Sequence, residues 1–191
     1  MFTKPKISRH QANVIFSIKK TSIPRKPKLF SRKSSSVPER LEIIYVPFYL
    51  FDVLVEKENK GNRESFTPKQ YVTLTVDGLL GHAVLFAANA LDVAKDEETP
   101  VPVCDFAISS ADAAKMALDQ YKGILLEHGL RTRSYTHAMK ISEGKKIYYP
   151  FWVGYFKKRR GYDFKALDAV SGEIQGVRMR RVFMRVLREL G

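Results

Sequence analysis

The sequence predicts an α+β fold: an antiparallel sheet made of two duplicated β-hairpin units, with helices packed on one face. Three observations carry this prediction, namely a repeat of aromatic strand segments, two amphipathic helical segments and an uneven charge distribution. With 191 residues, of which 45% are hydrophobic, the chain has the length and the apolar content of one ordinary globular domain. Collagen-like, coiled-coil and disulfide-scaffold classes are excluded by the same composition.

The N-terminal stretch is strongly basic. Residues 1–40 hold eleven Lys and Arg and a single acid, Glu39. Such a composition is typical of organelle transit peptides, but it equally suits a tail that binds RNA, DNA or anionic lipid, or a solvated leader with no partner. Pro24, Pro27 and Pro38 mark residues 21–39 as a linker. We therefore predict a basic leader and linker over residues 1–39 and a single α+β domain over residues 40–191.

An internal repeat organises this domain. Residues 44–49 (IYVPFY) and 147–152 (IYYPFW) share four of six residues, and further along Tyr71, Asp77 and Gly81 have the same spacing as Tyr162, Asp168 and Gly172. Two matched blocks in the same order indicate a duplication, with copies over about 41–92 and about 109–191.

Each copy has the pattern of a β-hairpin followed by a tight turn. Residues 44–55 and 147–156 are rich in Ile, Val, Tyr and Phe, and residues 71–76 and 162–167 are the predicted return strands. Pro47 and Pro150 each remove one backbone donor, so we expect them at a bulge or on an edge strand. In the Asp-x-x-x-Gly segments, the aspartate is expected to cap local amides and the glycine to take a positive φ.

Two helices are predicted around the second copy. The first begins at Ser109 or Ser110, has Asp112 as the partner in a capping box, and ends at Gly129. The second covers about 177–190, with apolar residues on one face and arginines on the other. Residues 82–92 fit either a strand or a helix.

A helix followed by antiparallel strands, with the aromatic strand and the turn of Tyr162, Asp168 and Gly172, resembles the PepSY-type and cystatin-like αβββ units. The likeness covers about half of that motif, in the second repeat; the family's opening helix-to-strand register is met only loosely around His128-Gly129-Leu130. The resemblance implies a unit that binds or inhibits partners and carries no catalytic residues.

Few residues suggest catalysis. The four histidines are scattered without an i, i+4 pair, which predicts no metal site, and no glycine-rich phosphate loop predicts a nucleotide cofactor. Cys104 stands in an apolar segment, which is typical of a buried inert thiol in a reducing compartment. Asp77 and Asp168 could form a carboxylate pair, but turn capping explains both. We predict no catalytic residues, no metal and no cofactor.

One constellation suggests binding, because it joins basic residues to aromatic ones. The basic candidates for contact with an anion or a nucleic acid are Lys157, Lys158, Arg159, Arg160, Arg178, Arg181, Arg185 and Arg188. The aromatic candidates for stacking are Trp152, Tyr155 and Tyr162. The alternative interpretation is a solvated turn with core aromatics, since only alternate residues of a strand share a face.

These patterns lead to a functional hypothesis. The chain is expected to be a non-enzymatic binding or assembly protein whose basic N- and C-terminal segments engage an acidic partner, either a protein subunit of a larger complex or RNA. The mitochondrial matrix is the expected location, with the cytoplasm as the alternative. Two other hypotheses are a small enzyme with a cleft between the repeats, where Tyr45, Tyr148, Asp77 and Asp168 would converge, and a protein that binds an anionic membrane surface.

Overall fold

The computed structural model describes residues 1–18, 37–59, 69–84, 93–94, 104–129 and 135–190. In this part of the chain, three helices accompany one sheet, so the predicted α+β class is confirmed. The helices are α1 (Arg9–Ser17), α2 (Ser110–Gly129) and α3 (Val177–Leu190). The strands are β1 (Phe2–Thr3), β2 (Arg40–Asn59), β3 (Lys69–Asp77), β4 (Ala83–Val84), β5 (Val93–Ala94), β6 (Tyr135–Ile141), β7 (Lys145–Lys158) and β8 (Gly161–Asp168).

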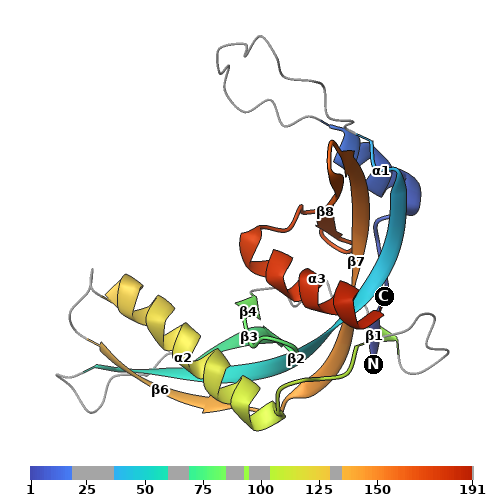
Figure 1. Ribbon diagram of the computed structural model, residues 1–191. Coiled ribbons are helices and arrows are strands. Elements are labelled where there is room, and N and C mark those ends of the chain that lie inside the picture. Colours follow the sequence, from blue (N-terminus) through green and yellow to red (C-terminus); the bar gives the residue numbers. More distant parts are fainter. Residues whose placement is uncertain (19–36, 60–68, 85–92, 95–103, 130–134, 191) are drawn as a thin grey trace.

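The sheet is centred on the long antiparallel pair of β2 and β7 (Figure 1). β6 continues the line of β7 along the same edge of β2, and the two are separated by residues 142–144. Here Asp52 exchanges two hydrogen bonds with Ser142, one to its backbone and one to its hydroxyl, both 2.9 Å. β3 flanks one half of the central pair and β8 the other half. The predicted antiparallel arrangement holds except for β1, which pairs with β7 in parallel.

The helices contact both sets of alternate residues in the central strands of this sheet. On β2, Ile44, Val46 and Phe48 belong to the core cluster of α3, whereas the intervening alternate positions Tyr49 and Phe51 belong to the cluster of α2. Successive side chains of a strand point to opposite faces, so α2 and α3 contact alternate residues of β2, at two successive stretches of that strand. α1 packs beside Trp152 and Phe156, on the face of β7 that is opposite to α3. Figure 1 shows α3 in the angle of the bent sheet.

The two hairpin turns have the same geometry. Asp77 and Asp168 are both buried, and one carboxylate oxygen of each accepts the amides two and three residues further on, at 2.7–3.1 Å. Gly81 and Gly172 close the turns at φ values of 77° and 78°. The strand registers also correspond, since Asp77 lies opposite Phe48 and Asp168 opposite its counterpart Phe151. The hairpins are therefore alike in structure, and their origin by duplication stays a prediction.

The likeness extends to α1 and α2. Ser8 caps α1 by accepting the Gln11 amide at 3.3 Å, and Ser109 accepts the Asp112 amide at 3.1 Å in the same position before α2. The residue before each cap is held by the opposite hairpin: Trp152 donates its indole N–H to the Ile7 carbonyl, and Tyr49, at the matching place in the repeat, donates its hydroxyl to Ile108, both at 2.8 Å. α1 is thus the structural counterpart of α2.

This correspondence changes the picture of the N-terminal stretch. The leader and linker were expected over residues 1–39, but residues 1–18 lie against the sheet, with Ala12 and Phe16 buried among Leu41, Phe156 and Leu167. The backbone amides of Lys6 and Ile7 donate to the Ala169 carbonyl, both at 2.8 Å. The basic side chains of this segment are on its exposed side, while Ala12 and Phe16 are buried and Ile7 and Ile15 pack against the same cluster. Residues 19–36 lie outside the described part.

Pro47 and Pro150 lie in the two central strands, although a bulge or an edge strand was expected. The β2–β3 pairing ends at Phe48 and the β7–β8 pairing ends at Phe151. Each proline is the next residue beyond that end, so its outer edge has no paired strand. The carbonyl of Pro47 accepts the amide of Gly78, and that of Pro150 accepts the amide of Ala169. The ring nitrogens face the same turns, so neither proline removes a bond between β2 and β7.

The other predicted elements are confirmed with small changes at their ends. The long strands, the return strands and both amphipathic helices occur where they were expected. Of the ambiguous segment 82–92, residues 83–84 form β4, and residues 85–92 lie outside the described part.

Candidate anion-binding surface

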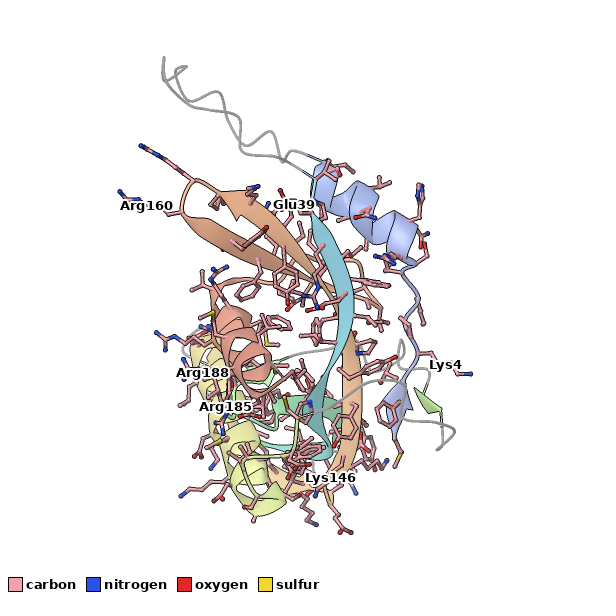
Figure 2. The ribbon with its side chains drawn as sticks, turned by 45° about the vertical axis from the view of Figure 1, so that its right-hand side comes forward. Lys4, Glu39, Lys146, Arg160, Arg185 and Arg188 are labelled. Atoms are coloured by element: carbon pink, nitrogen blue, oxygen red, sulfur yellow. The ribbon has the colours of Figure 1, made fainter. Side chains whose placement is uncertain are left out.

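The tip of the β7–β8 hairpin carries four consecutive basic residues. Lys157, Lys158, Arg159 and Arg160 are all exposed, and Gly161 has a φ of 92°, which permits the tight reversal into β8. Figure 2 shows Arg160 at this end of the molecule, pointing away from the sheet. The predicted basic tip is therefore accessible to solvent.

Strand alternation divides the three aromatic candidates between the two faces of the sheet. Trp152 lies on the face that α1 covers, where it is half-buried and bonded to Ile7. Tyr155 and Phe164 are partners in the register on the α3 side, and so are Lys157 and Tyr162 one pleat further on. Tyr162 is 64% exposed. Trp152 therefore packs against the N-terminal segment, and Tyr162 is the candidate whose ring is accessible for stacking.

Tyr155 is partly covered by its own neighbours. Its hydroxyl donates to the Glu42 carboxylate, and the Arg40 guanidinium lies 5.5 Å from its ring centroid. Burial, followed by the bond to Glu42, raises the pKa of Tyr155 well above its ordinary value. The phenol therefore stays protonated and anchored. Arg40 is 73% exposed, forms an ion pair with Glu42 at 2.5 Å and lies on the same face as Lys157 and Tyr162.

α3 joins this hairpin directly. The Arg180 guanidinium binds the Asp163 carboxylate at 2.6 Å, donates to the Phe164 carbonyl at 2.9 Å and lies 4.4 Å from the Phe164 ring centroid. The bond from Arg180 holds the pKa of Asp163 below its ordinary value. These contacts tie α3 to the strand that carries Tyr162.

The arginines of α3 have different roles. Arg185 is tied down, since it bonds to the Glu189 carboxylate at 2.9 Å and to the Leu79 carbonyl at 3.0 Å. Arg178, Arg181 and Arg188 are exposed and form no ion pair with any described residue. The opposite side of the helix is fixed in the core by Met179, Val182, Phe183 and Val186. The uncompensated positive charge is thus on the solvent side of a rigid element.

We refer to the exposed cations and the ring of this region as the basic face. It is defined by Arg40, Lys157, Arg159, Arg160, Tyr162, Arg178, Arg181 and Arg188. Sequence reasoning missed Arg40, which it assigned to the domain boundary, and Arg180, which it left off the arginine stripe. Arg40 could have been found because it stands just before the aromatic segment of β2, where it lies opposite Tyr155. The Arg180 contacts depend on how α3 crosses β8.

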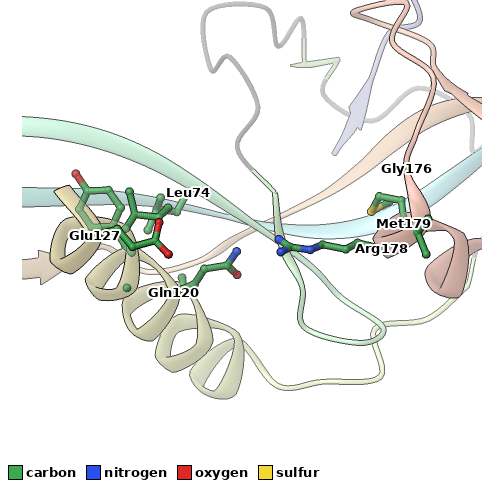
Figure 3. Close-up of a pocket in the computed structure, with 11 residues that line it drawn as sticks. Leu74, Gln120, Glu127, Gly176, Arg178 and Met179 are labelled. Atoms are coloured by element: carbon green, nitrogen blue, oxygen red, sulfur yellow. The ribbon is translucent and has the colours of Figure 1, made fainter. Parts of the chain in front are cut away.

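In the described part of the chain, two of the shallow grooves that border α3 are large. One has a volume of about 750 Å³ and runs past Leu80, Val177, Met184 and Arg188. The other, of about 780 Å³, lies between α2 and the start of α3 and is lined by Leu74, Tyr121 and Ile124, with Arg178 extending toward α2 (Figure 3). Val177 is 82% exposed and Met184 is 49% exposed beside these arginines. The grooves extend the basic face with apolar surface.

The side chains considered as catalytic candidates, Asp77, Asp168 and Cys104, lie outside the basic face. Asp77 and Asp168 are enclosed in their own turns, and the second also accepts the Tyr149 hydroxyl at 2.9 Å. Burial, followed by the neighbouring Glu189 carboxylate, raises the pKa of Cys104 to about 11. Among the described residues, no three His, Cys, Asp or Glu side chains could hold a metal ion together, and no helix is long and apolar enough to cross a membrane.

Comparisons with protein-family models, with curated proteins and with solved structures found no match for this chain. The likeness to PepSY-type and cystatin-like units therefore stays a prediction.

Proposed function

We propose that this chain is a non-enzymatic binding protein that engages an acidic macromolecular partner through the basic face. The observation that carries the proposal is the set of exposed arginines on α3, Arg178, Arg181 and Arg188, none of which pairs with a described acid. A fold gains nothing from unpaired like charges on one side of a helix, whereas an anionic partner is attracted and oriented by them. Import into the mitochondrial matrix remains part of this proposal, with the cytoplasm as the alternative location.

The enzyme hypothesis is less well supported by the geometry. It required a cleft in which Tyr45, Tyr148, Asp77 and Asp168 converge. In the described part, both aspartates are enclosed in turns, and the rings of Tyr45 and Tyr148 are packed against Phe2, with ring centroids 5.5 and 4.9 Å apart. The two grooves beside α3 contain none of these four residues.

The membrane hypothesis relied on amphipathic segments at both ends of the chain. α3 places its apolar face in the core against the sheet, and α1 does the same with Ala12 and Phe16. An interfacial helix must insert its apolar face among lipids. These faces are already used within the fold, which favours a soluble polyanion over a lipid surface as the partner.

The test is binding to model polyanions at two salt concentrations. We expect a labelled polyglutamate, or a labelled single-stranded RNA of about 12 nucleotides, to bind at about 50 mM salt and to bind more weakly at about 200 mM, because bound cations are released on association. Arg181→Glu should weaken this binding about tenfold, since one contact becomes a repulsion.

The matched control is Lys115→Glu on α2, an exposed position with the same change in charge but outside the basic face. It should change the affinity by less than about twofold. Equal losses in the two variants, or no binding of either polyanion at low salt, would contradict the proposal.

A further inference from the structure

The basic face combines two kinds of side chain that a folded domain has no need to place together. Tyr162 exposes 64% of its surface on an outer strand, and Lys157 lies directly opposite it in the register. The exposed ring is not part of the core, and the lysine ammonium beside it is accessible to an anion. The arrangement provides a flat apolar platform with positive charge at its border.

From these observations we infer that the basic face binds single-stranded nucleic acid, with a base stacked on Tyr162 and phosphates bound by the surrounding cations. The inference rests on the proposed function and names the partner class. An unpaired base has an accessible π-face that any aromatic ring can stack on, and its phosphates follow at regular intervals. A nucleic acid therefore uses both features of the surface, whereas an acidic peptide uses only the charges.

Cations lie on both sides of the ring. Toward the hairpin tip are Arg159 and Arg160, and toward α3 the ion pair of Asp163 with Arg180 leads to Arg181. With about 3.3 Å per strand residue and about 1.5 Å per helix residue, the strand from Gly161 to Phe164 spans about 13 Å and α3, which crosses it, about 21 Å. These lengths accommodate a short single strand, near the lower end of the site sizes found in single-strand-binding proteins.

The first hairpin carries an equivalent tyrosine, which allows a comparison with Tyr162 in the same molecule. Tyr71 holds the position in β3 that Tyr162 holds in β8, and it is 76% exposed. Opposite Tyr71 in the register lies Leu54, where the second hairpin has Lys157. One hairpin therefore presents a tyrosine next to an apolar residue, and the other presents the same ring inside a basic surface. The row of Tyr71 and Leu54 continues to one exposed cation, Lys140, whereas Lys157 is followed by Arg159 and Arg160 at the hairpin tip. The second hairpin thus has the larger charge for a phosphate backbone.

The experiment measures the affinity of the full chain for four labelled probes by fluorescence anisotropy. The probes are single-stranded RNA and single-stranded DNA of about 12 nucleotides, a duplex of the same length, and polyglutamate of similar charge. We expect the single strands to bind most tightly. Tyr162→Ala should weaken their binding about tenfold and leave the duplex and polyglutamate within about twofold, because only an unstacked base uses the ring.

Two variants serve as controls. Tyr162→Phe keeps the ring and should retain the affinity for single strands, and Tyr71→Ala removes the equivalent ring outside the basic face and should also retain it. Both substituted positions are exposed, so the melting temperatures should stay close to that of the unsubstituted chain.

The outcomes separate this inference from the proposed function. If polyglutamate binds as tightly as the single strands, or if Tyr162→Ala has no effect on them, the nucleic-acid inference is overturned and the general proposal of an acidic partner stands. If none of the probes binds at low salt, both are overturned.

Discussion

At the scale of single residues, the paired aspartates show that a pattern typical of catalytic carboxylates can also arise from turn capping. Asp77 and Asp168 are buried carboxylates at matched positions, a pattern that also occurs in acid–base catalysis. Their oxygens, however, accept backbone amides at 2.6–3.1 Å within their own turns. A carboxylate with its lone pairs already occupied stabilises the turn and has little capacity left for a substrate.

Cys104 provides a prediction with a pH dependence. Its side chain is 3% exposed, and burial raises its pKa to about 11, so the folded protein holds the neutral thiol at pH 7. We expect no reaction with a thiol reagent until the protein is unfolded by urea. Since the pKa is higher in the folded state, the stabilising contribution is complete below the unfolded pKa of about 8.5. It is lost as the pH rises from there toward 11.

The measurement for Cys104 is the urea midpoint as a function of pH, with Cys104→Ala as the control. The unsubstituted chain should lose more stability than the variant between about pH 8.5 and the upper end of the titration. Rapid labelling of the folded chain at pH 7 would contradict the buried, neutral thiol.

At the scale of elements, α1 and α2 show how one arrangement is reached with different side chains. Phe16 of α1 comes close to Gly154, where a Cβ atom would lie 3.2 Å from its ring. In the repeat, the counterpart of Phe16 is Ala117 of α2 and the counterpart of Gly154 is Phe51 of β2, and both belong to one core cluster. The helix contributes the large side chain in one case and the sheet in the other. The total volume is maintained, which is the condition for a well-packed core.

This packing predicts the effect of truncating Phe16. The side chain is 3% exposed and its ring centroid lies 5.9 Å from that of Phe156, so Phe16→Ala should lower the free energy of unfolding by about 3–4 kcal/mol. The control is Val14→Ala on the outer side of α1, where 46% exposure limits the cost to about 0.5 kcal/mol. Urea unfolding measures both, and equal midpoints for the two variants would show that α1 does not pack as described.

The elements also show how much could be predicted from sequence. The long strands, their return strands and helices α2 and α3 follow from residue alternation and amphipathic spacing. Residues 11–20 also fit a short helix, but the place of α1 in the core was not predicted, because the helix has nine residues and the basic composition favoured a leader. A signal was present, since Ile7, Ser8 and Ala12 recur as Ile108, Ser109 and Ala113.

The candidate site was predicted in part for a related reason. Runs of Lys and Arg can be read directly, so the tip and the arginines of α3 were included. Trp152 was grouped with Tyr155 although residues three apart in a strand lie on opposite faces. The contacts of Arg180 with Asp163 and Phe164 depend on the crossing of α3 over β8, which local patterns do not encode.

At the scale of the whole molecule, the halves are arranged about the pairing of β2 with β7. Val46 lies opposite Tyr149 in the register, and the same two residues are counterparts in the repeat. This is the geometry of an approximate two-fold axis through the central strands. α3 lies over the Val46 side of the sheet and, in the described part, has no counterpart in the first half.

This arrangement predicts that residues 1–18 stay in the working protein. Removal of about 30–40 residues on import would take away β1 and α1 and expose Leu41, Phe156 and Leu167 to water. We therefore expect the intact mass of the protein from its own cells to include this segment. A mass that corresponds to a chain starting near residue 40, in a protein that retains its melting temperature, would contradict the role of α1 and support cleavable targeting.

The exchange of helices between the halves has a consequence for synthesis on the ribosome. α1, translated first, rests on Phe156 and Leu167 of the second half and is held through Ala169, so its docking site is among the last parts of the chain to be made. Contacts between residues so far apart in sequence form slowly, because a long loop must close before they can stabilise anything. During synthesis, α1 therefore stays without its packing partners until nearly the whole chain has left the ribosome.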